Sequence, residues 1–218
     1  MRKWLPLQQR SRFHARWQTA GIFRVNAHIA AVAGISCKRR RIWREAHDAG
    51  CAELFSRRRD NKYDLYRVAV TGGDEQRLTS KGAYDDGPEY SPDGKWIYFN
   101  SNRSGGWDIW RIPPEGAGPQ DGQAERVTSD ELEDWFPHFS PNEKWMVMLS
   151  FPKGTAGHDD KMNGMMLRMM RAPGKKLKST KIQVLSTFFG GQGTINVNSW
   201  SPDSKKFAYV VYAPLTAR

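Results

Sequence analysis

Three segments of the chain begin with the same short motif and continue into a run of apolar residues. The segment Ser91–Phe99 (SPDGKWIYF) recurs as Ser140–Met148 (SPNEKWMVM) and as Ser201–Tyr209 (SPDSKKFAY). The copies start 49 and 61 residues apart, and a loop over residues 152–163 would explain the longer interval. Such a repeat restricts the fold strongly, because each unit buries its apolar face only against its neighbours. A period in the forties is typical of one four-stranded blade of a β-propeller.

The residues around the first copy predict four short strands. Residues 88–91, 95–101, 107–112 and 124–128 alternate in the manner of strands, and Pro92, Asp93 and Gly94 form a tight turn between the first two. Proline presets the backbone for such a turn, and glycine accepts the left-handed conformation that the turn requires. Ser204 replaces this glycine in the third copy, which predicts a different turn or local strain there.

The copies are flanked by incomplete units. Residues 63–79 match the last two strands of a blade, and residues 197–212 match only the first two. We therefore expect an all-β fold over residues 61–218, a partial β-propeller of two whole and two half antiparallel blades. Closed propellers have about four to eight blades, so exposed edge strands are expected at residues 63–68 and 205–212. Two chains would supply six blade equivalents, and a ring formed by a homodimer is compatible with the sequence.

Several motifs recur in a fixed order and resemble those of the TolB-like β-propeller family. They are Ser-Pro-Asp-Gly before an aromatic strand, Asp-Ile-Trp or Asp-Leu-Tyr, and Arg-Val-Thr or Arg-Leu-Thr, all within residues 60–212. The resemblance implies a six-bladed propeller exported to the periplasm, where TolB itself binds a peptidoglycan-associated lipoprotein. This chain offers half of those blades and no recognisable amino-terminal partner domain.

The first 60 residues differ from the repeats in charge. They contain 14 Lys and Arg against 4 Asp and Glu, whereas residues 61–218 contain 20 against 19. We expect an irregular or partly helical basic segment, and one hypothesis is a shifted reading frame or a misassigned start. The alternative is a short helical, basic extension. A further hypothesis is that the basic runs at 38–41 and 57–59 contact phosphates, with Trp4, Trp17 and Trp43 stacking on bases. Nucleic-acid binding is not expected of the repeats.

Targeting and catalytic signals are weak. Polar residues interrupt the apolar stretches near the amino terminus, so neither a convincing signal peptide nor a transmembrane segment is predicted. Cys37 and Cys51 define no metal site. The chain contains no Gly-x-Ser-x-Gly, His-Glu-x-x-His or lysine-containing phosphate-loop motif. We expect no enzymatic activity, cofactor or metal, and we interpret residues 158–160 and 85–86 as solvated loops rather than cation ligands.

The loops that enter each blade are the predicted binding site. In a propeller they meet at the mouth of the central channel, and varied polar groups on a fixed scaffold suit recognition. The equivalent positions are Asp86 with Glu89, Trp135 with His138, and Asn196 with Ser199. The predicted function is therefore a noncatalytic interaction propeller that holds a protein or peptide partner in the cell envelope. The alternative is the propeller portion of a prolyl-oligopeptidase-like serine hydrolase that lacks its catalytic domain.

Overall fold

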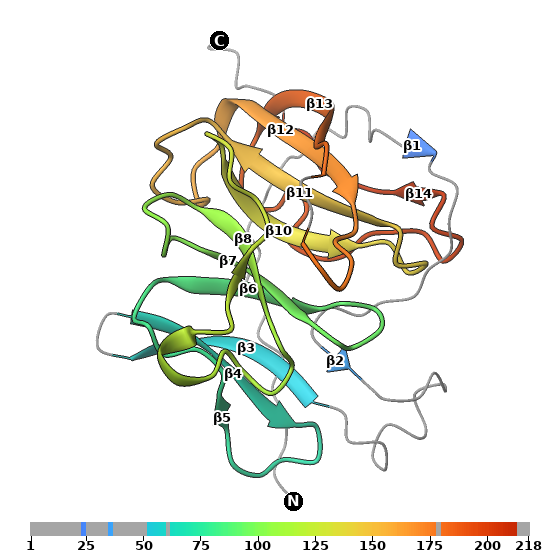
Figure 1. Ribbon diagram of the computed structural model, residues 1–218. Coiled ribbons are helices and arrows are strands. Elements are labelled where there is room, and N and C mark those ends of the chain that lie inside the picture. The colour runs from blue at the N-terminus through green and yellow to red at the C-terminus, as the bar shows by residue number, and fades with distance from the viewer. Residues whose placement is uncertain (1–22, 25–34, 37–51, 60–61, 178–179, 213–218) are drawn as a thin grey trace, which may run out of the picture.

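The computed structural model describes residues 23–24, 35–36, 52–59, 62–177 and 180–212, and antiparallel strands dominate it (Figure 1). Three four-stranded sheets follow one another along the chain, each with its strands in sequence order. Sheet one contains β2 (Ile35–Ser36), β3 (Ala52–Arg59), β4 (Lys62–Ala69) and β5 (Gln76–Arg77). Sheet two contains β6 (Asp85–Tyr90), β7 (Ile97–Ser101), β8 (Asp108–Ile112) and β9 (Glu125–Arg126). Sheet three contains β10 (Glu133–Phe139), β11 (Trp145–Phe151), β12 (Met162–Arg171) and β13 (Gln183–Gly190).

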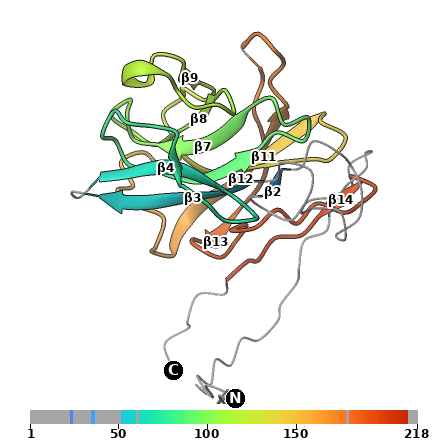
Figure 2. The same cartoon turned by 90° about the horizontal axis from the view of Figure 1, so that it is seen from below.

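Two smaller elements complete the described part of the chain. A 3-10 turn, η2 (Pro119–Asp121), lies between β8 and β9. Strand β1 (Phe23–Arg24) pairs with β14 (Lys206–Phe207) near the carboxyl end. Figure 1 shows the sheets in succession from the teal strands β3 and β4 to the orange strand β12, and Figure 2 shows β3 and β4 side by side in an orthogonal view. The predicted all-β architecture of four-stranded antiparallel blades is confirmed.

The three Ser-Pro motifs occupy matching places in the structure. In each, the serine N–H donates to the carbonyl oxygen five residues later, and the serine Oγ accepts the N–H of that same residue. These two distances are 2.8 and 3.0 Å for Ser91 with Trp96, 2.8 and 2.9 Å for Ser140 with Trp145, and 2.6 and 2.8 Å for Ser201 with Lys206. The recurring motif therefore encodes one turn three times, and the hydroxyl group is the reason for its serine.

The fourth residue of each turn has a left-handed backbone. The φ angle is +70° at Gly94, +62° at Glu143 and +44° at Ser204. Its N–H donates to the carbonyl oxygen of the motif serine in all three copies. Only glycine adopts this conformation without steric cost, so the second and third turns carry strain that the first lacks. The expectation for Ser204 is confirmed, since the turn is kept and the residue is forced into it.

A second recurring network explains the Asp and Arg-x-Thr motifs. In sheet two, Asp108 pairs with Arg126 at 2.8 Å, and Thr128 Oγ1 accepts the Ile109 N–H at 2.9 Å. In sheet one the equivalent Asp64, Arg77 and Thr79 make the same contacts, with the ion pair at 2.6 Å and the hydroxyl bond to Leu65 at 3.0 Å. The threonine thus supplies the hydrogen bond that the very short outer strand cannot provide to its neighbour.

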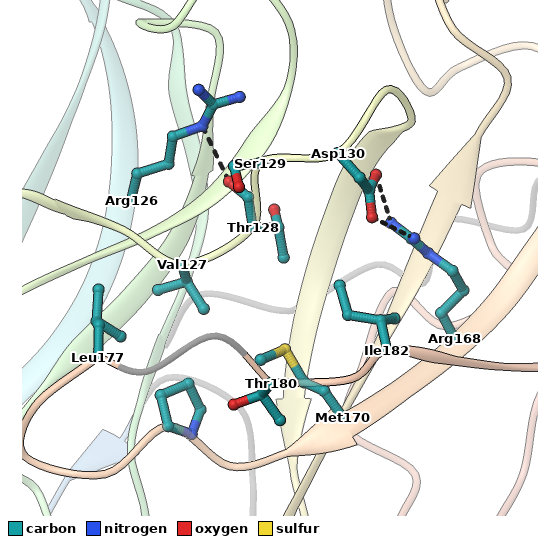
Figure 3. Close-up of a pocket in the computed structure, with 11 residues that line it drawn as sticks. Arg126, Val127, Thr128, Ser129, Asp130, Arg168, Met170, Leu177, Thr180 and Ile182 are labelled. Carbon is teal, nitrogen blue, oxygen red and sulfur yellow. Dashed lines mark hydrogen bonds and ion pairs between the residues drawn. The ribbon is translucent and has the colours of Figure 1, made fainter.

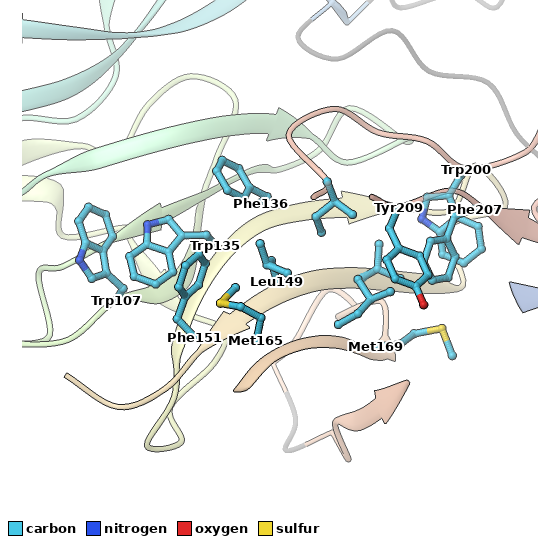
Figure 4. Close-up of a cluster of buried hydrophobic side chains, with 13 residues drawn as sticks. Trp107, Trp135, Phe136, Leu149, Phe151, Met165, Met169, Trp200, Phe207 and Tyr209 are labelled. Atoms are coloured by element: carbon cyan, nitrogen blue, oxygen red, sulfur yellow. The ribbon is translucent and has the colours of Figure 1, made fainter. Parts of the chain in front are cut away.

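The alternation of side chains along the strands buries both faces of the middle sheet. On β7, Ile97 and Phe99 pack toward sheet one, whereas Tyr98 packs toward sheet three. Strand β11 repeats this pattern, with Met146 and Met148 on one face. Its other face joins the largest cluster, which Figure 4 shows running across sheet three: Trp107, Trp135, Phe136, Leu149, Phe151, Met165, Met169, Trp200, Phe207 and Tyr209. The aromatic residues of the strands therefore form the core, as their spacing predicts.

The amino-terminal segment contributes more strand than the sequence indicates. Residues 52–59 form β3, which pairs with β4 along its whole length from Ala52↔Ala69 to Arg59↔Lys62. Leu54 is buried against sheet two, and Phe55 stacks on Tyr66 at 5.8 Å. An irregular or helical conformation was expected for residues 1–60, so this strand is a difference from prediction. Most of that segment, including Trp4, Trp17, Trp43, Cys37, Cys51 and residues 38–41, lies outside the described residues.

The expected edge strands are placed differently. Strand β4 is an inner strand, because β3 and β5 pair with its two sides, so residues 63–68 are not an exposed edge. At the carboxyl end, the predicted two-stranded half blade is reduced to a bridge between Trp200 and Phe207 and to the short strand β14. The chain after Phe207 turns back toward sheet three, where the N–H groups of Val210 and Tyr212 donate to Thr194 and Phe189.

Candidate functional site

The first strands of sheets two and three each contain a bulge. The strand register shifts between Asp86 and Glu89 on β6, and between Trp135 and His138 on β10. Gly87 and Phe136, each followed by a proline, have φ angles of +60° and +55°. The proline lacks the N–H that a regular ladder would need, so pairing is interrupted there. A bulge re-aims the side chains on either side of it, and these are the positions that the sequence predicts as a binding site.

Asp86 forms the exposed part of this arrangement. Its Oδ2 lies 3.6 Å from His158 Nε2, and its side chain is 28% exposed. Burial would raise the pKa of Asp86, but the nearby His158 ring and the Gly87 N–H favour the charged carboxylate more strongly, so the pKa is lowered. The carboxylate is therefore ionised at neutral pH and partly open to solvent.

Two tyrosines lie beside this carboxylate. The rings of Tyr63 and Tyr84 stack with centroids 4.0 Å apart, and Trp107 meets Tyr84 edge-on at 5.1 Å. Burial, a hydrogen bond with Tyr63 and the charge of Asp86 together raise the pKa of Tyr84 to about 12. The phenol consequently stays neutral over the physiological range. We call Asp86, His158, Tyr63 and Tyr84 the Asp86 site.

Glu89 and His138 meet inside the protein. The Glu89 carboxylate accepts hydrogen bonds from His138 Nδ1 at 2.6 Å, from the Phe139 N–H at 3.2 Å and from Asn198 Nδ2 at 2.8 Å. The other ring nitrogen of His138 faces the carbonyl oxygen of Ile195. Both side chains are buried, so this network joins β6, β10 and the segment before the third Ser-Pro turn. A direct role of Glu89 and His138 in binding stays a prediction.

Of the remaining predicted site residues, Trp135 reaches the Asp86 site, because its ring meets His158 edge-on at 5.9 Å. Trp135 is completely buried, with Trp107 at 5.0 Å and Phe151 at 4.7 Å from its ring. Asn196 accepts the Gly193 N–H at 2.7 Å, and Ser199 donates to the Val197 carbonyl oxygen at 3.0 Å, so both bond within their own loop. The structure thus brings Glu89 and His138 together but does not join all six residues in one surface. Their shared role in binding remains a prediction.

Three contributors to this region were not selected from the sequence. Asn198 and Ser56 reach it from segments remote in the chain, and His158 was interpreted as a solvated loop residue. His158 is largely buried, because its ring packs edge-on against Phe136 at 5.0 Å. Asp85 also differs from expectation, since it is fully buried and pairs with Arg103 at 2.6 Å. Within the described ranges, no group of three acidic, histidine or cysteine side chains is arranged to hold a metal ion.

Comparison with known proteins decides the family. Residues 49–181 match the family described as the TolB beta propeller domain. The chain belongs to the TolB-like β-propeller family. The match begins ahead of residue 61 and includes β3, in agreement with the place of that strand in sheet one. In the part of the chain that the structure describes, no helix is long and apolar enough to cross a membrane.

Individual relatives support the assignment. The chain is 40% identical over 157 residues to an uncharacterized protein of Agrobacterium fabrum, which covers 72% of this chain and 50% of the relative. It is similar to the structure of a putative TolB from Agrobacterium tumefaciens, with a TM-score of 0.65, 37% identity, and coverage of 77% of this chain and 56% of the other. The chain thus spans about half the length of these relatives.

More distant structures share the fold alone. TolB from Acinetobacter baumannii has a TM-score of 0.53 at 19% identity, covering 70% of this chain and 33% of that protein. A puromycin-hydrolyzing peptidase of Mycobacterium tuberculosis has a TM-score of 0.50 at 17% identity, covering 65% of this chain and 21% of the peptidase. The second likeness says nothing about activity, because propellers of this kind occur with several functions.

Proposed function

We propose that this chain is a noncatalytic interaction propeller whose Asp86 site binds a protein or peptide partner in the bacterial envelope. One observation carries the proposal. The Asp–Arg–Thr and Ser-Pro networks repeat between sheets as scaffold. Asp86, ionised and 28% exposed, lies at a bulge that also recurs, but the residue types at this bulge differ between the sheets. Function on propellers is supplied by such non-repeated groups on a rigid frame.

The chemistry of the Asp86 site favours a cationic group of the partner. A lysine, an arginine or an amino terminus would form a charge-assisted hydrogen bond with the carboxylate. Arg58 of this chain already lies 6.0 Å from the centre of the Tyr63 ring. Tyr84, stacked on Tyr63 beside the carboxylate, would add an attraction between its π-electrons and the partner's cation. The bulge supports this role, because the Gly87 N–H holds the Asp86 carboxylate in place.

Membership of the TolB-like family supports the envelope as the location and a peptidoglycan-associated lipoprotein as the first partner to test. Isothermal titration of the soluble domain of that lipoprotein into the full chain measures the affinity. We expect Asp86→Asn, which keeps the shape but removes the charge, to weaken binding about tenfold, corresponding to about 1.4 kcal/mol. The matched control Asp74→Asn removes the same charge from an exposed hairpin residue and should leave binding unchanged.

Two results would count against the proposal. Equal affinities of the Asp86→Asn and Asp74→Asn variants would exclude the Asp86 site, and failure of the lipoprotein to bind the unmodified chain would exclude that partner. Turnover of aminoacyl p-nitroanilides by the purified chain would contradict the noncatalytic role, and the structural likeness to a peptidase by itself does not favour such turnover.

A further inference from the structure

A cavity lies between sheets two and three, and none of its lining residues belongs to the Asp86 site. Its volume is about 570 Å³, and it is formed by the chain that follows β9 and by β12 with the loop before β13. Figure 3 shows that Val127 approaches it from one sheet, while Met170, Leu177 and Ile182 approach it from the other. Val127 and Ile182 also pack on the core between the two sheets. The cavity therefore has one apolar side, which continues the core between the sheets, and one polar wall.

The polar wall of the cavity is fixed by internal ion pairs. Arg168 donates to both carboxylate oxygens of Asp130, at 2.6 and 3.2 Å, and also pairs with Asp134. Arg126 is held by Asp108 at 2.8 Å. These guanidinium groups already have carboxylate partners, so the wall does not present free charge for a small anion. The apolar side chains are the part of the cavity that is left for a ligand.

The loop beside the cavity is strongly basic. Residues 171–182 contain five Lys and Arg and no acidic residue. The buried Arg111 of sheet two donates to the carbonyl oxygens of Gly174 and Lys175, at 2.7 and 3.1 Å, and so fixes the loop from below. The side chains of Lys175, Lys176 and Lys181 are exposed. Exposed lysines consequently lie beside the apolar side of the cavity, which favours a partner with acidic groups next to an apolar one.

Strand β13 begins at the same place, and among the described residues β12 is its only strand partner. Near the far end of the strand the Phe189 carbonyl oxygen accepts the Tyr212 N–H, so the outer edge that is left open runs over residues 183–188. Strand β13 is the outermost strand of sheet three and eight residues long, whereas β5 and β9 in the equivalent positions have two residues each. Its Val184 is 55% exposed. A long outer strand presents a row of N–H and C=O groups that an extended chain can pair with.

We propose that an extended acidic segment of a partner protein adds to the edge of β13 and places one aliphatic side chain in the adjacent cavity. Main-chain hydrogen bonds to β13 would give affinity that is independent of sequence. The cavity would select the aliphatic residue, and Lys175, Lys176 and Lys181 would select the neighbouring carboxylates. This interface is separate from the Asp86 site, whose charge is opposite, so the two surfaces take different partners.

Fluorescence anisotropy on the full chain tests this interface with a defined probe. The probe is a short fluorescein-labelled peptide that alternates glutamate with threonine and carries a central leucine. Companion peptides replace the leucine with glycine or every glutamate with lysine. We expect the acidic leucine peptide to bind at least tenfold more tightly than either companion.

Charge variants of the protein locate the binding. Lys175→Glu combined with Lys176→Glu should weaken binding of the acidic leucine peptide about tenfold. The matched control, Lys205→Glu with Lys206→Glu, makes the same charge change at the third Ser-Pro turn and should alter binding less than twofold. Leu177→Asp, which places a carboxylate at the cavity, should abolish the preference for leucine over glycine.

Several results would overturn the proposal. They are equal binding of the three peptides, equal effects of the two lysine pairs, and no binding of the acidic leucine peptide at about 1 mM. Light scattering of the free protein tests whether a second copy of the chain occupies the β13 edge instead. A doubled mass that the Lys175 and Lys176 substitutions abolish would assign the edge to that second copy. Loss of lipoprotein binding in the Asp86→Asn variant is independent of all these outcomes.

Discussion

Replacing Glu143 with glycine should stabilise the protein. Glu143 occupies the left-handed position of the second Ser-Pro turn at φ +62°, where the first turn has Gly94 at +70°. Its side chain is exposed, so little packing is lost with it. Ser204 holds the third position at φ +44°, and there the side chain is buried and Oγ has no hydrogen-bond partner among the described residues.

The magnitude follows from two opposing contributions. A non-glycine residue in the left-handed region costs about 1–2 kcal/mol. Glycine makes the unfolded chain more flexible, which returns about 0.5–1 kcal/mol. Glu143→Gly should therefore raise the free energy of unfolding by about 0.5–1 kcal/mol. Ser204→Gly should raise the free energy of unfolding by about 1 kcal/mol more than Glu143→Gly does, because it also removes a buried hydroxyl without a partner. The reverse change, Gly94→Ala, should lower the free energy of unfolding by about 1 kcal/mol.

Urea unfolding followed by tryptophan fluorescence provides the measurement. The urea midpoint should be highest for Ser204→Gly and then decrease through Glu143→Gly and the unmodified chain to Gly94→Ala. All four should share one slope of unfolding free energy against urea concentration. The melting temperature of Glu143→Gly should rise by about 2 °C. If Glu143→Gly leaves the midpoint unchanged or lowers it while Gly94→Ala is harmless, the three turns do not share the left-handed position, and the reasoning from the repeat fails.

Four other substitutions test the networks and the bulge. Thr79→Val and Thr128→Val each leave a strand N–H unpaired and should cost about 1–3 kcal/mol alike in urea unfolding; unlike costs would contradict their equivalence. Burial raises the pKa of Asp134 to about 6, so the folded state binds this proton more tightly than the unfolded chain and gains stability as pH falls from above 6 to below 4. Relative to Asp134→Asn, the unmodified chain should gain on the order of 3 kcal/mol between pH 7.5 and 4, and a difference independent of pH would exclude this. Gly87→Ala should weaken lipoprotein binding and lower the melting temperature, because its Cβ would lie 2.6 Å from Asn100 Oδ1 at a φ of +60°, and unaltered binding would separate the bulge from the site.

The turns and outer strands could be predicted from sequence because local chemistry determines them. The Ser-Pro hydroxyl bond and the Asp–Arg–Thr network each lie within about 20 residues of chain, so every copy carries its own complete signal. Strand β3 gives no such signal. Its residues place Leu54 and Phe55 side by side before three arginines, and the strand is determined by pairing with β4 rather than by alternation.

The candidate site was only partly predictable for the same reason. Asp86 and Glu89 could be selected as non-repeated residues beside a recurring motif. His158 and Asn198 could not, since each reaches β6 from a loop whose path depends on how sheet three packs against sheet two. Trp135 was selected from the sequence but lies in the core. It differs between repeats, as a binding residue would, but it fills the space between Trp107 and Phe151.

Hydrogen–deuterium exchange of the full chain with and without the lipoprotein domain tests the central claim most directly. The account predicts added protection at residues 84–89 and 152–160, which hold Asp86 and His158, with the three Ser-Pro turns unaffected. Protection confined to the Ser-Pro turns, with residues 84–89 exchanging as in the free protein, would contradict it.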